Sequence, residues 1–128
     1  MLVVRGQEIG FTPASHEDFQ RPGVLKKVLA TREAFVEGRV QMLNWSLCPK
    51  GSAFRKHFHE DMQETFVILN GAVRMEVAGE TVHLQAGDAI LIEAREVHQM
   101  FNIGDEDVTY IVFGISTGQN GRTILVDE

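Results

Sequence analysis

The sequence predicts an all-β domain, either a sandwich or a barrel. Gly71, Gly79 and Gly87 recur every eight residues, and the segments between them alternate apolar and polar side chains. Alternation with a period of two is typical of half-buried strands. More strand-like segments follow, and hardly any stretch has the period of a helix. Short strands at this spacing indicate a sandwich or barrel, because a propeller blade or solenoid repeat needs a longer period.

Composition narrows the class of protein. The chain has 128 residues, which fits one domain, and its 44% hydrophobic and 23% charged residues are ordinary for a soluble globular protein. The net charge of −6 weighs against nucleic acid as a partner and gives no reason to expect a membrane surface. Cys48 is the only cysteine and the amino end lacks a signal peptide's apolar core. We therefore expect a cytoplasmic protein.

The first third of the chain is the least regular. Residues 1–23 are expected to form an irregular arm, within which residues 2–5 could be a short strand. Residues 24–35 fit an amphipathic helix nearly as well as strands, and we favour strand because strands follow. Residues 38–51 are expected to contain a strand that Pro49 helps to end.

The second half has clearer turn signals. Asn70-Gly71 predicts a tight type I′ hairpin, because that turn needs positive φ at both central residues. Ala78-Gly79 and Ala86-Gly87 mark further turns. The strands expected after them lie within residues 88–94, 96–103 and 108–116.

The segment "HFHEDMQE", residues 57–64, suggests a metal site. On a strand, His57 and His59 project from one face and Phe58 from the other. Two neighbouring imidazoles can bind one divalent ion, although a histidine pair alone is equally typical of a solvated loop. The polar residues 60–63 are expected to turn the chain, so that Glu64 begins a strand beside the histidines and supplies an oxygen ligand.

The residues around this segment resemble two motifs of the cupin family. The first motif is matched by the spacing of Gly51, His57, His59, Glu64 and Gly71. The second is matched by the spacing of Gly87, His98 and Asn102. Residues 51–102 thus carry both motifs in the family's order.

The second motif departs from the family's pattern at two positions. Glu93 stands where a proline is usual, and Arg95 stands where a glycine is usual. Arg95 cannot adopt positive φ as cheaply as glycine, so the sequence leaves the geometry of this turn open.

The resemblance implies a fold and a metal site. The expected fold is a double-stranded β-helix, or jelly-roll barrel, formed by residues 1–128 as a single domain. The metal ligands it implies are His57, His59, Glu64 and His98. Three imidazoles and one carboxylate suit Mn, Fe, Ni, Co, Cu or Zn, and a six-coordinate ion would keep about two positions open.

The function expected from the resemblance is that of a small-molecule metalloenzyme. Dioxygenase chemistry is the first expectation, and isomerase or decarboxylase chemistry is the next. The alternative is a non-catalytic barrel that binds or senses a small ligand. Family analogy also implies a homodimer.

Four further residues are candidates for contact with the substrate. Arg55 has the strand parity of His57 and could pair with an anionic ligand at the cavity mouth, although a solvated loop explains it as well. Phe66, Met100 and Asn102 share parity with expected ligands, and core packing is the alternative for the first two.

Two histidines are not expected to bind the metal. His16 lies in the polar arm, and His83 alternates with Val82 and Leu84, so it should face away from the core.

Overall fold

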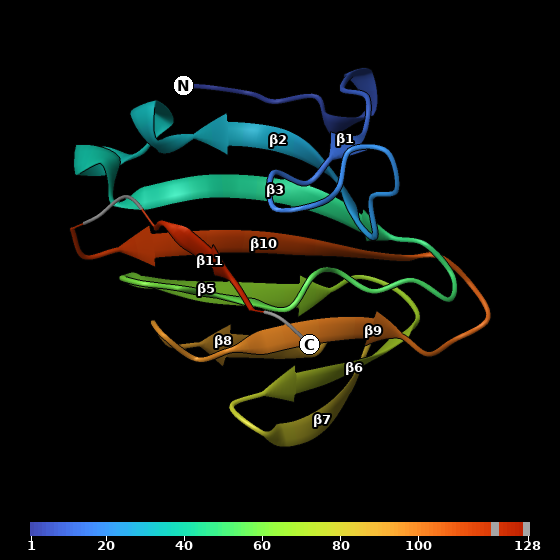
Figure 1. The fold of residues 1–128 in the computed structure, drawn as a ribbon. Helices are drawn as coiled ribbons and strands as arrows, with labels where there is room; N and C mark the ends of the chain where they lie inside the picture. The colour runs from blue at the N-terminus through green and yellow to red at the C-terminus, as the bar shows by residue number, and fades with distance from the viewer. Residues whose placement is uncertain (119–120, 127–128) are drawn as a thin grey trace.

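The structure, a computed structural model, describes residues 1–118 and 121–126, which form two antiparallel sheets facing each other (Figure 1). The six-stranded sheet has the order Thr12–Pro13 (β1), Leu25–Thr31 (β2), Val40–Cys48 (β3), Val108–Ser116 (β10), Met62–Ile68 (β5) and Ala89–Ile92 (β8). The five-stranded sheet has the order Thr123–Leu125 (β11), His57–His59 (β4), His98–Asn102 (β9), Ala72–Val77 (β6) and Glu80–Gln85 (β7). Short 3₁₀ turns lie at Gly6–Glu8 (η1), Arg32–Ala34 (η2) and Val36–Gly38 (η3).

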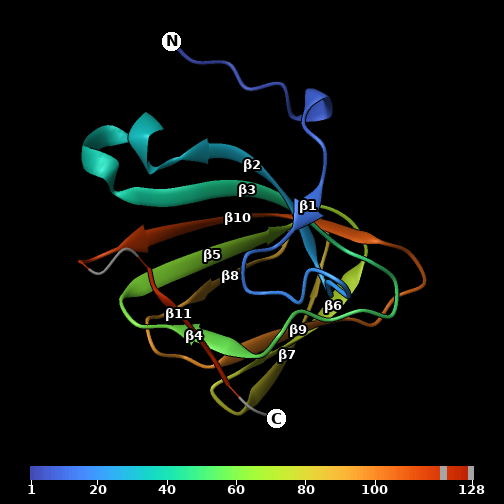
Figure 2. The same cartoon turned by 45° about the horizontal axis from the view of Figure 1, so that its top comes forward.

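The chain winds between the two sheets from β4 onward. β4 belongs to the five-stranded sheet, β5 to the six-stranded sheet, and the chain crosses again before β6, β8, β9, β10 and β11. Figure 2 shows the resulting barrel with the two sheets as its walls. This winding is the double-stranded β-helix, so the predicted all-β jelly-roll fold is confirmed.

Only one of the three glycine turns closes a hairpin. Ala78 and Gly79 have φ of 49° and 83° and join β6 to β7, which pair directly. The type I′ hairpin predicted at Asn70-Gly71 is wrong, because Gly71 carries the chain from β5 into the other sheet. The Asn70 side chain instead bonds to the start of β10, where its Oδ1 accepts from the Thr109 amide at 2.9 Å. Gly87 likewise lies where the chain crosses back, between β7 and β8.

The amino-terminal third is partly regular. Residues 2–5 form no strand, whereas residues 25–31 form β2, so strand was the right choice there. The Lys27 ammonium donates to the Gly6 carbonyl at 2.9 Å and lies 4.4 Å from the Trp45 ring centre. This contact holds the segment before β1 against the outer face of the six-stranded sheet.

The core lies between the inner faces of the sheets. Ile68, Val73, Met75, Met100 and Val108 are completely buried there. Within the described residues, no helix is long and apolar enough to cross a membrane.

Arg95 has the left-handed conformation that the second motif demands. Its φ is 70°, in the turn between β8 and β9, and its amide donates to the His59 carbonyl at 2.7 Å. The turn is therefore tied to β4. The arginine holds a conformation that costs an L-residue about 1–2 kcal/mol.

We expect Arg95→Gly to stabilise the protein. Glycine removes the backbone strain of the folded state, but it also gives the unfolded chain more conformational freedom. The first effect is the larger, so the free energy of unfolding should rise by about 0.5–1 kcal/mol. Urea denaturation measures it. Arg95→Ala is the control, because it removes the side chain and keeps the strained φ. An equal gain from both variants would contradict the backbone explanation.

Candidate metal centre

The strand register brings the two motifs together. In the five-stranded sheet β4 lies beside β9, and His57 is directly opposite His98. His57 and His59 are buried on the same face of β4, while Phe58 is only partly buried on the other, as predicted.

Glu64 comes from the opposite wall of the barrel. β5 pairs with β10 and β8 in the six-stranded sheet, so the prediction that Glu64 starts a strand beside the histidines is wrong. The chain turns at residues 60–61 and crosses to the other sheet, and Glu64 then points back across the interior. The carboxylate therefore faces the imidazoles from across the barrel.

The four side chains converge at one point. Within the described residues, one group of side chains has the composition and spacing to hold a metal ion, with ligand atoms all within 4.8 Å of one another. We call this group the quartet: His57, His59, Glu64 and His98. The Glu64 Oε1 lies 3.2 Å from the His59 Nε2 and 3.3 Å from the His98 Nε2. Neighbouring ligand atoms about 2.1 Å from a metal are separated by about 3 Å, so the geometry fits.

Backbone carbonyls orient all three imidazoles. The Nδ1 of His57 contacts the Arg55 carbonyl at 2.6 Å, and the Nδ1 of His98 contacts the Glu96 carbonyl at 2.9 Å. The Nδ1 of His59 lies 3.3 Å from the Gly121 carbonyl. A carbonyl only accepts, so the Nδ1 proton of each ring points to it and the Nε2 faces the centre; the Thr123 Oγ1 also lies 3.2 Å from the His59 Nδ1. In the neutral form of each ring that Nε2 is a bare lone pair.

A carboxylate oxygen and three imidazole lone pairs thus share one point, and a cation there satisfies all of them. Burial would raise the pKa of Glu64, but the hydrogen bonds and charge of His59 and His98 lower it far below its usual range. Burial lowers the pKa of His57 to about 3, with His98 and His16 adding to the effect. Burial also lowers the pKa of His59, but Glu64, the Gly121 carbonyl and Asp61 together raise it by more. The ionised carboxylate and the neutral His57 are the forms that bind metals.

A cavity of about 330 Å³ opens above the quartet. His57, His59 and Glu64 line it, and His98 lies fully buried outside the lining. Most of the remaining wall is apolar, and its larger side chains are Val24, Val28, Met42, Phe54, Met62, Phe66, Tyr110 and Val112. Such a volume is at the small end of ligand pockets.

His16 belongs to this cavity although the sequence placed it in a polar arm. It is not one of the quartet, as expected, but its ring centre lies 4.3 Å from that of His57. Glu17 fixes the segment by accepting from the amides of Gly23 at 2.6 Å and Arg55 at 2.8 Å. The adjacent His16 and Glu17 were the sequence signal that could have marked this segment as part of the site. The sequence alone did not reveal which wall of the cavity they would contact.

The four candidate substrate contacts fall in different places. Phe66 lines the cavity. Met100 is completely buried in the core. The Asn102 amide donates to the Cys48 and Glu106 carbonyls at 3.0 and 2.8 Å, so it holds loops together. The Arg55 side chain is exposed at a separate pocket, and its carbonyl is what reaches the site.

Comparisons with known proteins agree with this geometry. The family model described as Cupin domain matches residues 44–114. The "Oxalate-binding protein" of Thermotoga maritima is 27% identical over 110 residues, which cover 86% of this chain and 90% of that protein. A crystal structure of a predicted oxalate decarboxylase from Thermotoga maritima has a TM-score of 0.81 and 26% identity, covering 91% of this chain and 100% of that one. The polyketide cyclase RemF of Streptomyces resistomycificus has a TM-score of 0.80 at 16% identity, covering 100% and 87%, and shows the fold alone.

We expect the metal-free protein to lose stability as the pH falls. Burial lowers the pKa of His16 to about 4 and that of His57 to about 3. The unfolded chain takes up both protons near pH 6.5, and the folded protein does not, so acidification favours unfolding. His59, whose pKa is raised, opposes this with one proton. The net loss between pH 7 and 5.5 should be about 2 kcal/mol in urea denaturation with a chelator.

Two variants test the origin of this pH dependence. His16→Asn should remove about half of the unfavourable contribution. His83→Asn, at an exposed site, should leave the pH dependence as it is. Stability that stays constant or rises on acidification would contradict the assignment.

Proposed function

The chain belongs to the cupin family, and on that premise we propose that it binds a small organic carboxylate at one divalent transition metal held by the quartet. The observation that carries the proposal is the convergence of three Nε2 lone pairs and one ionised carboxylate at the cavity. This donor set suits Mn, Fe, Ni, Co, Cu or Zn, and about two open positions would accept a carboxylate.

The ligand class follows from the open side of the site and from the comparisons. A divalent ion beside one carboxylate leaves net positive charge, which favours a small anionic ligand. Two proteins at 27% and 26% identity carry names that refer to oxalate. Both points support a carboxylate ligand for this chain.

Decarboxylation is the reaction that we place first. A bound metal would polarise a carboxylate or carbonyl oxygen as a Lewis acid. The chain's own residues would do the rest: the carbonyls of Arg55 and Glu96 hold the ligand imidazoles in place, and apolar walls such as Phe66 and Val112 limit water. Dioxygenase and isomerase chemistry, expected from the sequence, come after it because a named relative favours decarboxylation.

Binding without turnover is the second candidate. Among the described residues that line the cavity, Glu64 is the only carboxylate, and the quartet uses it. His16 is the nearest other base, and burial lowers its pKa to about 4. The relative named "Oxalate-binding protein" favours the same alternative.

We further infer a homodimer formed through the outer face of the six-stranded sheet. Exposed or half-exposed apolar side chains lie across four neighbouring strands: Leu43 on β3, Ile111 and Phe113 on β10, Val67 on β5 and Leu91 on β8. Trp45 of β3 lies beside them and is covered by the segment before β1. A continuous apolar face of this kind marks an interface. A second copy is its simplest occupant, because identical faces pair around a two-fold axis.

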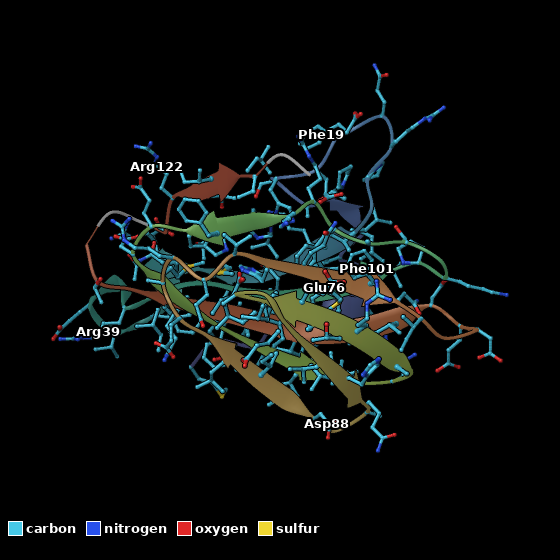
Figure 3. The ribbon with its side chains drawn as sticks, turned by 60° about the horizontal axis from the view of Figure 1, so that its bottom comes forward. Phe19, Arg39, Glu76, Asp88, Phe101 and Arg122 are labelled. Carbon is cyan, nitrogen blue, oxygen red and sulfur yellow. The ribbon has the colours of Figure 1, made fainter. Side chains whose placement is uncertain are left out.

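The outer face of the five-stranded sheet carries charged side chains. The Arg74 guanidinium lies 4.3 Å from the Phe101 ring centre and 3.2 Å from the Glu76 carboxylate. Figure 3 shows Glu76 and Phe101 together on that face. This contrast supports the six-stranded sheet as the side that a partner covers.

A reducing location remains part of the proposal. Cys48 is completely buried and unpaired, and burial raises its pKa to about 12, which agrees with an inert thiol in the cytoplasm.

We expect His57→Ala to lower the metal affinity by more than about a hundredfold, because removing a ligand costs more than removing its orienting partner. Metal content of the purified protein, measured by mass spectrometry, checks this. His83→Ala is the matched control and should keep the metal. Folded wild-type protein without metal after supplementation with each candidate ion would refute the proposal.

Oxalate should bind the metal-loaded protein and not the chelator-treated protein. Isothermal titration calorimetry measures binding, and carbon dioxide release from oxalate measures turnover. Binding with turnover supports the decarboxylase, and binding without turnover supports the ligand-binding alternative. Equal binding with and without metal would contradict both.

The dimer should dissociate in Leu91→Glu, whose side chain is 56% exposed in the single chain. Ile103→Glu, 46% exposed in a loop outside this face, is the control and should remain dimeric. Light scattering coupled to size exclusion gives the masses. A monomeric wild type would rule the dimer out.

A further inference from the structure

The cavity wall carries polar groups that the quartet does not use, and two of them lie on neighbouring strands. Lys26 of β2 and Asn44 of β3 both line it. Within the described part of the chain, no carboxylate forms an ion pair with the Lys26 ammonium, and burial lowers its pKa. Asn44 is 7% exposed, and its Oδ1 is buried without a hydrogen-bond partner. Buried polar groups without partners destabilise a protein unless a ligand satisfies them.

These groups lie well away from the quartet along the same inner face. Val28, Asn44, Val112 and Phe66 form one row across β2, β3, β10 and β5. Lys26 is opposite Ser46, next to that row, and Glu64 is two residues before Phe66 on β5. Three strand spacings separate β2 from β5, which is about 14 Å between backbones.

The wall between Asn44 and Glu64 is apolar. Val112 and Phe66 follow Asn44 along the row toward β5, with Met62 near the quartet. An oxalate-sized ion has no apolar surface to place against these side chains, and it is too short to meet both the quartet and Lys26. The cavity volume of about 330 Å³ leaves room for a longer ligand.

We propose that the cavity takes an organic acid longer than oxalate, whose carboxylate lies at the quartet, whose apolar middle lies against Val112 and Phe66, and whose second oxygen-bearing group reaches Lys26 and Asn44. This inference rests on the proposed function and names its ligand class. The ammonium donates to the distal oxygen in a charge-assisted hydrogen bond, and the Asn44 Oδ1, which only accepts, takes a hydrogen bond from a distal hydroxyl.

Calorimetry with Mn²⁺-loaded protein tests the length and the distal group separately. The ligands are oxalate, succinate and adipate, with hexanoate and its ω-hydroxy analogue as matched acids for adipate. Adipate should bind more tightly than oxalate, and about tenfold or more tighter than hexanoate, because a hydrogen bond to a charged group is worth about that factor. The ω-hydroxy acid shows whether a neutral oxygen suffices.

Variants of Lys26 and Asn44 test whether these residues cause the difference in affinity between the acids. Lys26→Met should bring the affinity for adipate down to that for hexanoate and leave hexanoate binding as it was. Asn44→Ala should weaken the ω-hydroxy acid selectively and should not weaken adipate, whose distal carboxylate has no proton to donate to the Asn44 Oδ1. Lys50→Met, which removes an exposed lysine outside the cavity, is the control and should bind every acid like the wild type. Circular dichroism verifies that each variant is folded.

The outcomes separate this inference from the proposed function. If oxalate binds in a metal-dependent way at least as tightly as adipate, or if Lys26→Met weakens all acids equally, the longer ligand is wrong and the metal-bound carboxylate stands. If no acid binds in a metal-dependent way, the proposed function fails and this inference fails with it.

Discussion

The constraint on which this structure depends is the meeting of four acceptor atoms at one point between two sheets. The imidazoles come from β4 and β9 of one sheet and the carboxylate from β5 of the other, so a cation at the centre would tie the walls of the barrel together. Backbone carbonyls orient all three imidazoles, and the Thr123 hydroxyl also contacts the His59 ring. The backbone of the barrel therefore fixes the orientation of the ligand imidazoles. The turn at Arg95 contributes, because the Arg95 amide donates to the His59 carbonyl.

The rest of the interior has two parts, a closed core and an open cavity. The completely buried residues, such as Ile68 and Met100, close the core between the sheets. Toward β2 the walls stay apart, and the segment that holds His16 lies over the resulting cavity. A single jelly roll can thus pair a rigid metal centre with a variable wall. That wall, more than the fold, decides which ligand is bound.

The sequence was most reliable where the signal was local. It predicted the all-β class and the shared face of His57 and His59, since each depends on a few neighbouring residues, and it left open the turn at Arg95, which the structure shows to be left-handed. It was wrong at Asn70-Gly71, because a glycine with positive φ serves a hairpin and a crossing between sheets equally well. The eight-residue glycine spacing therefore marks a mixture of hairpin and crossings, and only the pairing of distant strands tells them apart.

By itself the sequence determined the strand-forming segments and, through the resemblance of residues 51–102, the four side chains that the fold gathers into the quartet. Alternation along the chain suffices for the strands, because parity sets the face of a strand, whereas the four side chains followed from the resemblance of the motifs. Only the tertiary structure decided that Glu64 reaches across the barrel, that Arg55 faces outward, and that His16, Lys26 and Asn44 share the cavity. These positions depend on which distant strands pair with each other. Strand pairing is determined by the burial of the whole core, and no short segment encodes it.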